Sequence, residues 1–219
     1  MPVWDIATRL FHWSVVILLI VSYVSISLAD GPQAAFWMRV HLLSGETMLG
    51  LLLFRLIWGL IGSETARFRH FLHSPFTAIA HLTHIRRREP DSQVGHNAAG
   101  GWMVIVMLAL LGAQVGTGLF SNDDGASEGP LAHLVAKSTS DWLSGLHGLI
   151  FNFIAVAIAL HLVAIVAYLA LKGHNLTRAM ITGKKRLPAI TAAPRMVSPL
   201  LAAATLAVSA GVTVLISRL

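Results

Sequence analysis

The chain of 219 residues contains no cysteine. Without thiols it has no disulfide, no thiolate-bound zinc and no iron–sulfur cluster held by cysteine. Covalent attachment of haem through a Cys-x-x-Cys-His motif is excluded for the same reason. Any metal or metal cofactor must therefore be held by other side chains, and the sequence offers eleven histidines for that purpose.

Charged residues are also scarce. They make up 12% of the chain, whereas 55% is hydrophobic and the mean hydropathy is +0.70. A bilayer core requires about 20 mostly apolar residues, and this composition is typical of a membrane protein. Five stretches meet the length requirement: Leu10–Leu28, Leu42–Ile61, Gly101–Phe120, Leu143–Leu171 and Val197–Ser217. The sequence therefore predicts an all-α integral membrane helical bundle.

The basic residues indicate how this bundle is oriented. A net charge of +6 would suggest nucleic-acid binding in a soluble chain, but here the lysines and arginines flank apolar stretches. With the N-terminus in the cytoplasm, only Arg39, Lys137 and Arg218 lie outside, as the positive-inside rule requires. The acidic loop from Ser121 to Trp142 then faces the periplasm. We expect a multi-pass protein of a bacterial inner membrane with no nucleic-acid partner.

Four histidines fall within or at the ends of the predicted spans: His12, His41, His147 and His161. An imidazole in hydrocarbon is costly unless it finds a partner. His147 and His161 lie fourteen residues apart, which is about 3.9 helical turns, so both rings point to nearly the same side about 21 Å apart. The predicted orientation sorts the four into an inner pair, His12 with His161, and an outer pair, His41 with His147. Two opposed pairs at two depths are what two b haems with two axial histidines each require.

Two other interpretations of these histidines stay open. Each could form a hydrogen bond between helices instead of binding a metal. A zinc site is a weaker rival, because opposed pairs about four turns apart cannot gather around one tetrahedral ion.

Three glycines near the outer pair are compatible with a flat cofactor between helices. Gly45 lies one turn after His41, and Gly145 and Gly148 flank His147. Glycine lets a porphyrin approach the backbone closely, although close helix packing explains glycine equally well.

A few polar residues also fall within the apolar stretches. Arg55 lies fourteen residues after His41, on nearly the same helix face and at the depth of the inner pair. A charge there needs a partner, for which we consider a haem propionate, or else a snorkelling position at the interface. The roles of Glu46, Gln114 and Arg39 cannot be separated from packing by sequence alone.

The loop after the second span predicts a short surface helix. Ser74 is a favourable N-cap, Pro75 suits the first helical position, and the following Phe76 is expected at the membrane surface. His70 and His73 have the spacing of metal ligands, but no acidic residue or cysteine accompanies them. We interpret this segment as a basic surface that faces lipid headgroups.

Several short motifs together resemble one known family. They are Val-Trp-Asp-Ile-Ala-Thr-Arg-Leu-Phe-His-Trp (3–13), Phe-Arg-Leu-Ile-Trp-Gly (54–59) followed by Ala-Arg-Phe (66–68), Gly-His-Asn-Ala-Ala-Gly-Gly-Trp (95–102), and Gly-Leu-Phe (118–120) with Asp-Asp (123–124). This combination resembles the prokaryotic cytochrome b561 family, which includes the b-type subunits of membrane-bound nickel–iron hydrogenases. Ala98 stands where the family pattern leads us to expect proline.

The resemblance covers about residues 3–187 and implies a four-helix core with two b haems. Their ligands map onto His12, His41, His147 and His161 of this chain. We expect a di-haem domain over residues 1–187 and an additional transmembrane helix over residues 188–219, on which the resemblance is silent.

An iron with two histidine ligands has no free coordination position, so electron transfer is favoured over chemistry at the metal. The chain has no Gly-x-Gly-x-x-Gly fingerprint and no large segment outside the spans, so it must exchange electrons with partners. We expect transfer between a periplasmic redox protein, such as a c-type cytochrome or a hydrogenase-like protein, and quinone in the membrane. One alternative is a superoxide:quinone oxidoreductase, an activity the family includes. Another is a histidine-lined metal transporter without haem.

Overall fold

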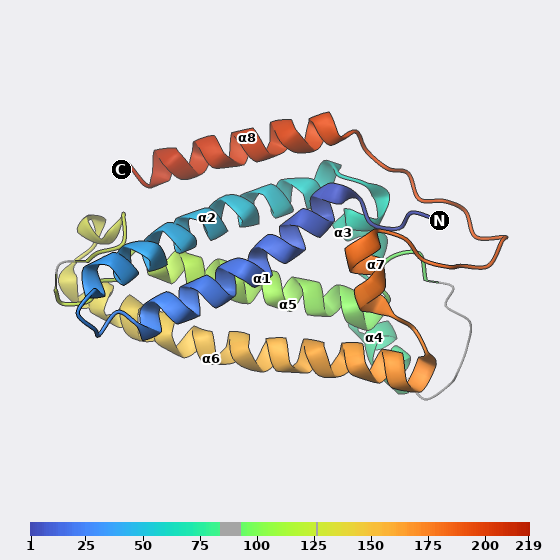
Figure 1. Ribbon diagram of the computed structural model, residues 1–219, viewed down its shortest axis with the longest axis horizontal. Helices are drawn as coiled ribbons and strands as arrows, with labels where there is room; N and C mark the ends of the chain where they lie inside the picture. The colour runs from blue at the N-terminus through green and yellow to red at the C-terminus, as the bar shows by residue number, and fades with distance from the viewer. Residues whose placement is uncertain (84–92, 126) are drawn as a thin grey trace. The chain divides into compact units, whose positions relative to one another are not determined.

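The computed structural model describes residues 1–83, 93–125 and 127–219. Within these ranges the chain is helical, and its extended backbone pairs only as isolated bridges, such as that between Pro2 and Lys184. Five helices are long and apolar enough to cross a membrane (Figure 1): α1 (Ile6–Ser27), α2 (Ala34–Ile61), α5 (Ala98–Gly118), α6 (Lys137–Ala167) and α8 (Pro199–Ile216). The predicted all-α membrane helical bundle is confirmed.

The helices extend beyond the apolar stretches that predicted them. α2 begins at Ala34 rather than Leu42, and α6 begins at Lys137 rather than Leu143. A hydropathy pattern is interrupted by charged residues such as Arg39 in α2 and Asp141 in α6, whereas backbone hydrogen bonds continue a helix past them. His41 therefore lies inside a helix and not at its start.

The C-terminal end of α6 has a feature that the sequence did not predict. The helix continues as a π-helical turn over Tyr168–Lys172 and ends at Gly173, whose φ is 73°. A left-handed residue at this position is favourable for glycine because it has no Cβ.

Short helices connect the long ones. They are η1 (Glu64–Ala66), α3 (Phe68–Phe71), α4 (Pro75–Thr83), η2 (Ala132–Leu134) and α7 (Leu176–Thr182). α4 begins at Pro75 as predicted, and Phe76 is 82% exposed. Its contact with lipid stays a prediction.

The chain divides into two compact units. Unit 1 comprises Met1–Leu10, Arg55–Met107 and Ala155–Ala203; unit 2 comprises Phe11–Phe54, Leu108–Ile154 and Ala204–Leu219. Both units contain portions of the long helices, so they do not test the predicted domain boundary after residue 187.

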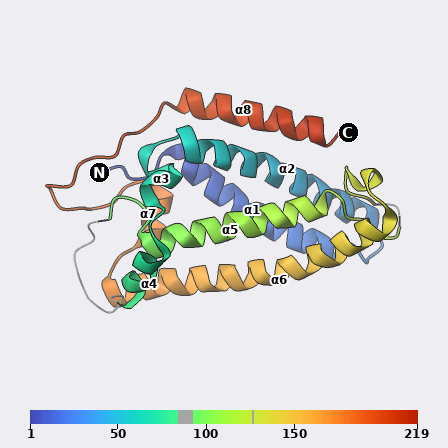
Figure 2. The same cartoon turned by 180° about the vertical axis from the view of Figure 1, so that it is seen from behind.

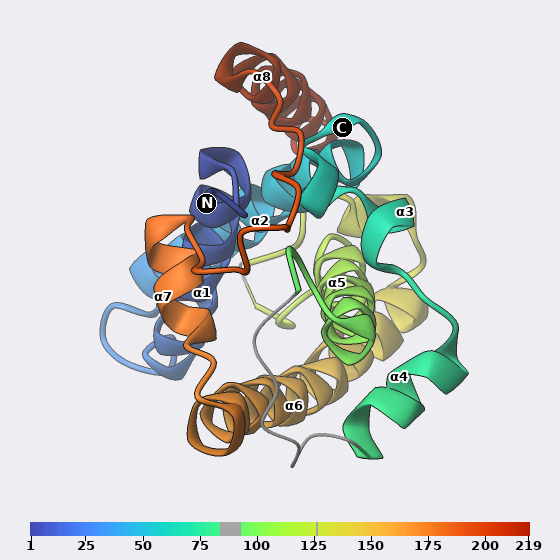
Figure 3. The ribbon, with the colours of Figure 1, turned by 90° about the vertical axis from the view of Figure 1, so that its right-hand side faces the viewer.

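In unit 1 the N-terminal segment lies beside α7 (Figure 3). The backbone N–H of Val3 donates to the carbonyl of Gly183 at 2.7 Å, and Val3 and Trp4 are buried together with Ala179. Asp5 then starts α1, because its carboxylate accepts from the backbone N–H of Thr8 at 2.6 Å. The first of the motifs therefore builds the core of this unit.

In unit 2 the helices are joined by small polar contacts and one aromatic stack. The hydroxyls of Ser22 in α1 and Ser44 in α2 lie 2.5 Å apart, and Tyr23 stacks on Phe151 of α6 at 5.6 Å. The portions of α5 and α6 in this unit run side by side in both views (Figures 1 and 2). These contacts position the residues of the candidate site.

Candidate functional site

The structure brings the predicted outer pair together in unit 2. The ring centroids of His41, from α2, and His147, from α6, lie 6.2 Å apart, and the ring planes are inclined by 81°. Two metal–nitrogen bonds of about 2 Å, plus about 1.2 Å from each nitrogen to its ring centre, amount to about 6.4 Å. The separation therefore suits two imidazoles that bind one metal ion from opposite sides.

Each ring of the outer pair uses its Nδ1 in a hydrogen bond to a neighbouring helix. His41 Nδ1 lies 3.0 Å from the carbonyl oxygen of Ser22, and His147 Nδ1 lies 2.9 Å from that of Gln114. A carbonyl only accepts, so Nδ1 carries the proton and Nε2 keeps the lone pair that an axial ligand needs. The helix-to-helix hydrogen bonds considered as an alternative are therefore present at both rings, and at His147 they involve both ring nitrogens.

The end of α5 surrounds His147 with three residues on one helix face. The Thr117 hydroxyl lies 3.2 Å from Nδ1, and the side-chain amide nitrogen of Gln114 lies 3.0 Å from Nε2. A Cβ on Gly118 would lie 2.9 Å from the ring carbon Cε1. Sequence reasoning gave Gln114 no definite role and missed Thr117 and Gly118. Their spacing of three and four residues was the available signal.

Open space lies beside each of the three predicted glycines. A Cβ on Gly45, Gly145 or Gly148 would meet no described atom within 4 Å. A close approach of a cofactor to these positions stays a prediction.

The inner pair divides between the units. His12 belongs to unit 2, where its ring meets Trp13 edge-on at 4.9 Å, and His161 belongs to unit 1. Their pairing stays a prediction from sequence.

Arg55 is buried in unit 1. The residue is only 3% exposed, and its guanidinium carbon lies 4.9 Å from the ring centre of Phe68. Nη1 is buried and has no hydrogen-bond partner among the described residues. This burial argues against the snorkelling alternative, and the unsatisfied N–H fits an anionic group such as a carboxylate.

Two further arginines of unit 1 also bury a guanidinium nitrogen that is unsatisfied. Arg9 and Arg67 each bury an Nε that has no hydrogen-bond partner among the described residues. Both belong to the motifs that carried the resemblance, but charge counting treated them only as topology signals. Unit 1 thus holds three guanidinium groups with unsatisfied donors.

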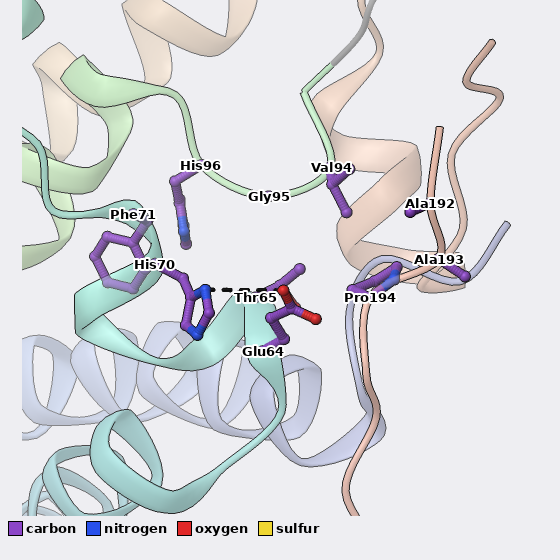
Figure 4. A pocket seen from close by; sticks show the side chains of 10 residues that line it. All are labelled: Glu64, Thr65, His70, Phe71, Val94, Gly95, His96, Ala192, Ala193 and Pro194. Carbon is purple, nitrogen blue, oxygen red and sulfur yellow. Dashed lines mark ion pairs between the residues drawn. The ribbon is translucent and has the colours of Figure 1, made fainter. Parts of the chain in front are cut away.

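A small pocket of about 160 Å³ in unit 1 lies beside α3 (Figure 4). His70 faces Glu64 across it, with Nδ1 3.8 Å from the carboxylate, and the ring of His96 packs between Trp4 and Phe71 at 4.7 and 4.9 Å. Sequence reasoning gave these histidines no ligand role. Among the residues that the structure describes, no group of three or more His, Cys, Asp or Glu could hold a metal ion.

Comparison with known protein families agrees with the bundle of membrane helices. A family model described as prokaryotic cytochrome b561 matches residues 3–183, a range that contains all four histidines of the predicted pairs and ends before α8. Comparisons with curated proteins and with solved structures found no match. The family consists of membrane b-type cytochromes of electron transfer, which normally bind b haem. This chain belongs to the prokaryotic cytochrome b561 family.

Proposed function

We propose that this protein carries two b haems and transfers electrons between a periplasmic redox partner and the quinone pool of a bacterial inner membrane. The observation that supports it most is the outer pair: His41 and His147 face each other at 6.2 Å, each with Nδ1 hydrogen-bonded to a backbone carbonyl. In this proposal they hold the outer haem, and His12 with His161 holds the inner one.

A haem also needs partners for its propionates and space beside its axial ligands, and residues of this chain fit both requirements. A haem carries two propionates, and the buried Nη1 of Arg55 lacks an acceptor. Gly45 and Gly148 leave open space next to the outer pair. When bound, the haems supply one-electron redox chemistry, and two histidine ligands leave the iron no open position for oxygen or substrate.

The periplasmic loop supplies a surface for the electron-exchanging partner. It contains Asp123, Asp124, Glu128 and Asp141, while Lys137 forms ion pairs with Asp124 and Asp141. A c-type cytochrome or a hydrogenase-like protein is the class of partner we propose on this side. Quinone is the carrier on the membrane side because it dissolves in the lipid that surrounds the helices.

The haem content of the purified protein tests this proposal. We expect a reduced spectrum of the b type and about two haems per chain by the pyridine haemochrome method. One haem per chain would overturn the two-pair assignment, and a colourless preparation would favour a metal transporter.

Superoxide separates an electron carrier from an oxidoreductase. A subunit that docks a protein partner should be reduced slowly by superoxide, whereas rapid reduction of the oxidised protein would make it a superoxide:quinone oxidoreductase.

A further inference from the structure

Gln114 occupies the one nitrogen of His147 that an iron would need. Nδ1 of His147 donates to the Gln114 carbonyl at 2.9 Å, so Nε2 carries the lone pair. The side-chain amide nitrogen of the same Gln114 lies 3.0 Å from this Nε2 and can only donate to it. All these atoms belong to unit 2.

One lone pair cannot accept an amide hydrogen and bind iron at the same time. The amide satisfies a partly buried ring nitrogen that would otherwise lack a partner. The Oε1 of Gln114, however, is buried without a hydrogen-bond partner among the described residues. The amide thus makes one hydrogen bond, to Nε2, and haem would have to break that bond to reach the nitrogen.

We propose that Gln114 is a displaceable cap on His147: its amide holds Nε2 in the haem-free protein and leaves when haem is inserted. This inference rests on the proposed function. The ring keeps its orientation when the cap leaves, because the Gln114 carbonyl and the Thr117 hydroxyl still hold Nδ1. Gln114 is thus a positioning residue that acts through His147.

Haem binding to the full-length haem-free protein tests the cap. A His161→Ala background leaves only the outer site to be filled. Gln114→Met keeps the length of the side chain but removes the donor, so haem no longer has to displace a hydrogen bond. We expect the dissociation constant for haem to fall about two- to tenfold, the range that one net hydrogen bond supplies. Gly116→Ala is the control on the same helix, because a Cβ there would meet no described atom within 4 Å; it leaves the cap in place and should not tighten binding.

A second measurement needs no haem. In haem-free protein labelled with ¹⁵N-histidine, the Nε2 resonance of His147 should move toward the position of an unbonded acceptor in Gln114→Met and stay in place in Gly116→Ala. Gln114→Leu serves if the methionine variant does not fold. Haem binding that is equal or weaker in the variant, or an unchanged Nε2 resonance, would overturn the cap. Failure of the parent to bind haem would instead refute the proposed function, while the resonance still reports on the cap.

Discussion

Gly118 offers the sharpest test of the outer site, because the smallest possible side chain should disturb it. A Cβ at this last residue of α5 would lie 2.9 Å from Cε1 and 3.2 Å from Nδ1 of His147. The ring is the movable partner, so Gly118→Ala should push it away from α5. That movement lengthens the contacts of Nδ1 with the Gln114 carbonyl and the Thr117 hydroxyl.

The expected size of the effect follows from these contacts. Loss of one net hydrogen bond costs about 0.5–1.5 kcal/mol, and a side chain turned about 30° from its rotamer costs about as much again. A total of about 1–3 kcal/mol corresponds to a haem affinity at the outer site that is about five- to 150-fold weaker. Haem titration of the haem-free protein, followed by absorbance, measures this affinity directly.

Gly116 provides the control on the same helix. A Cβ there would meet no described atom within 4 Å. Alanine at that position should leave haem binding unchanged and stabilise the helix by about 0.5–1 kcal/mol, because glycine loses more backbone entropy on folding. If Gly118→Ala bound haem as well as Gly116→Ala did, the placement of the α5 end against His147 would be refuted.

Three other changes test separate parts of the proposal. Arg55→Met should lower the content of the inner haem because it removes the buried donor, whereas Arg39→Met on the same helix should not. The number of haems per chain measures this, and equal haem content in the two variants would contradict a role for Arg55. His147→Ala should abolish the outer optical component and His161→Ala the inner one, and an unchanged spectrum would refute that ligand. Deletion of residues 188–219 should keep both haems, since the family match ends at residue 183, and loss of haem would make α8 part of the core.

The membrane helices could be predicted from sequence because hydropathy averages over about 20 residues and is insensitive to any one of them. The residues at which these helices begin could not be predicted in the same way. α2 starts at Ala34 and α6 at Lys137 because helical hydrogen bonding continues past charged residues that interrupt an apolar stretch. The π-helical turn at Tyr168–Lys172 depends on local backbone geometry that apolar periodicity does not encode.

The candidate site also has a part that the sequence predicted and a part that it did not. Counting residues along predicted spans placed His41 and His147 at one level, and the two rings do meet. The surroundings of His147 were missed because they depend on which face of α5 turns toward it, and α5 is apolar almost all round. Arg9 and Arg67 were counted only as topology signals, since a charge count cannot distinguish an exposed guanidinium from one that buries an N–H.

Unsatisfied atoms discriminate between a bundle that binds a cofactor and one whose histidines only join helices. A buried polar atom without a partner costs about 1–3 kcal/mol, and simple helix packing gives no reason to keep one. Unit 1 buries Nη1 of Arg55, which is a donor, and unit 2 buries Oε1 of Gln114, which is an acceptor, neither with a partner among the described residues. A propionate would satisfy the first. Haem therefore relieves the cost at Arg55, which favours the haem-binding interpretation over packing alone.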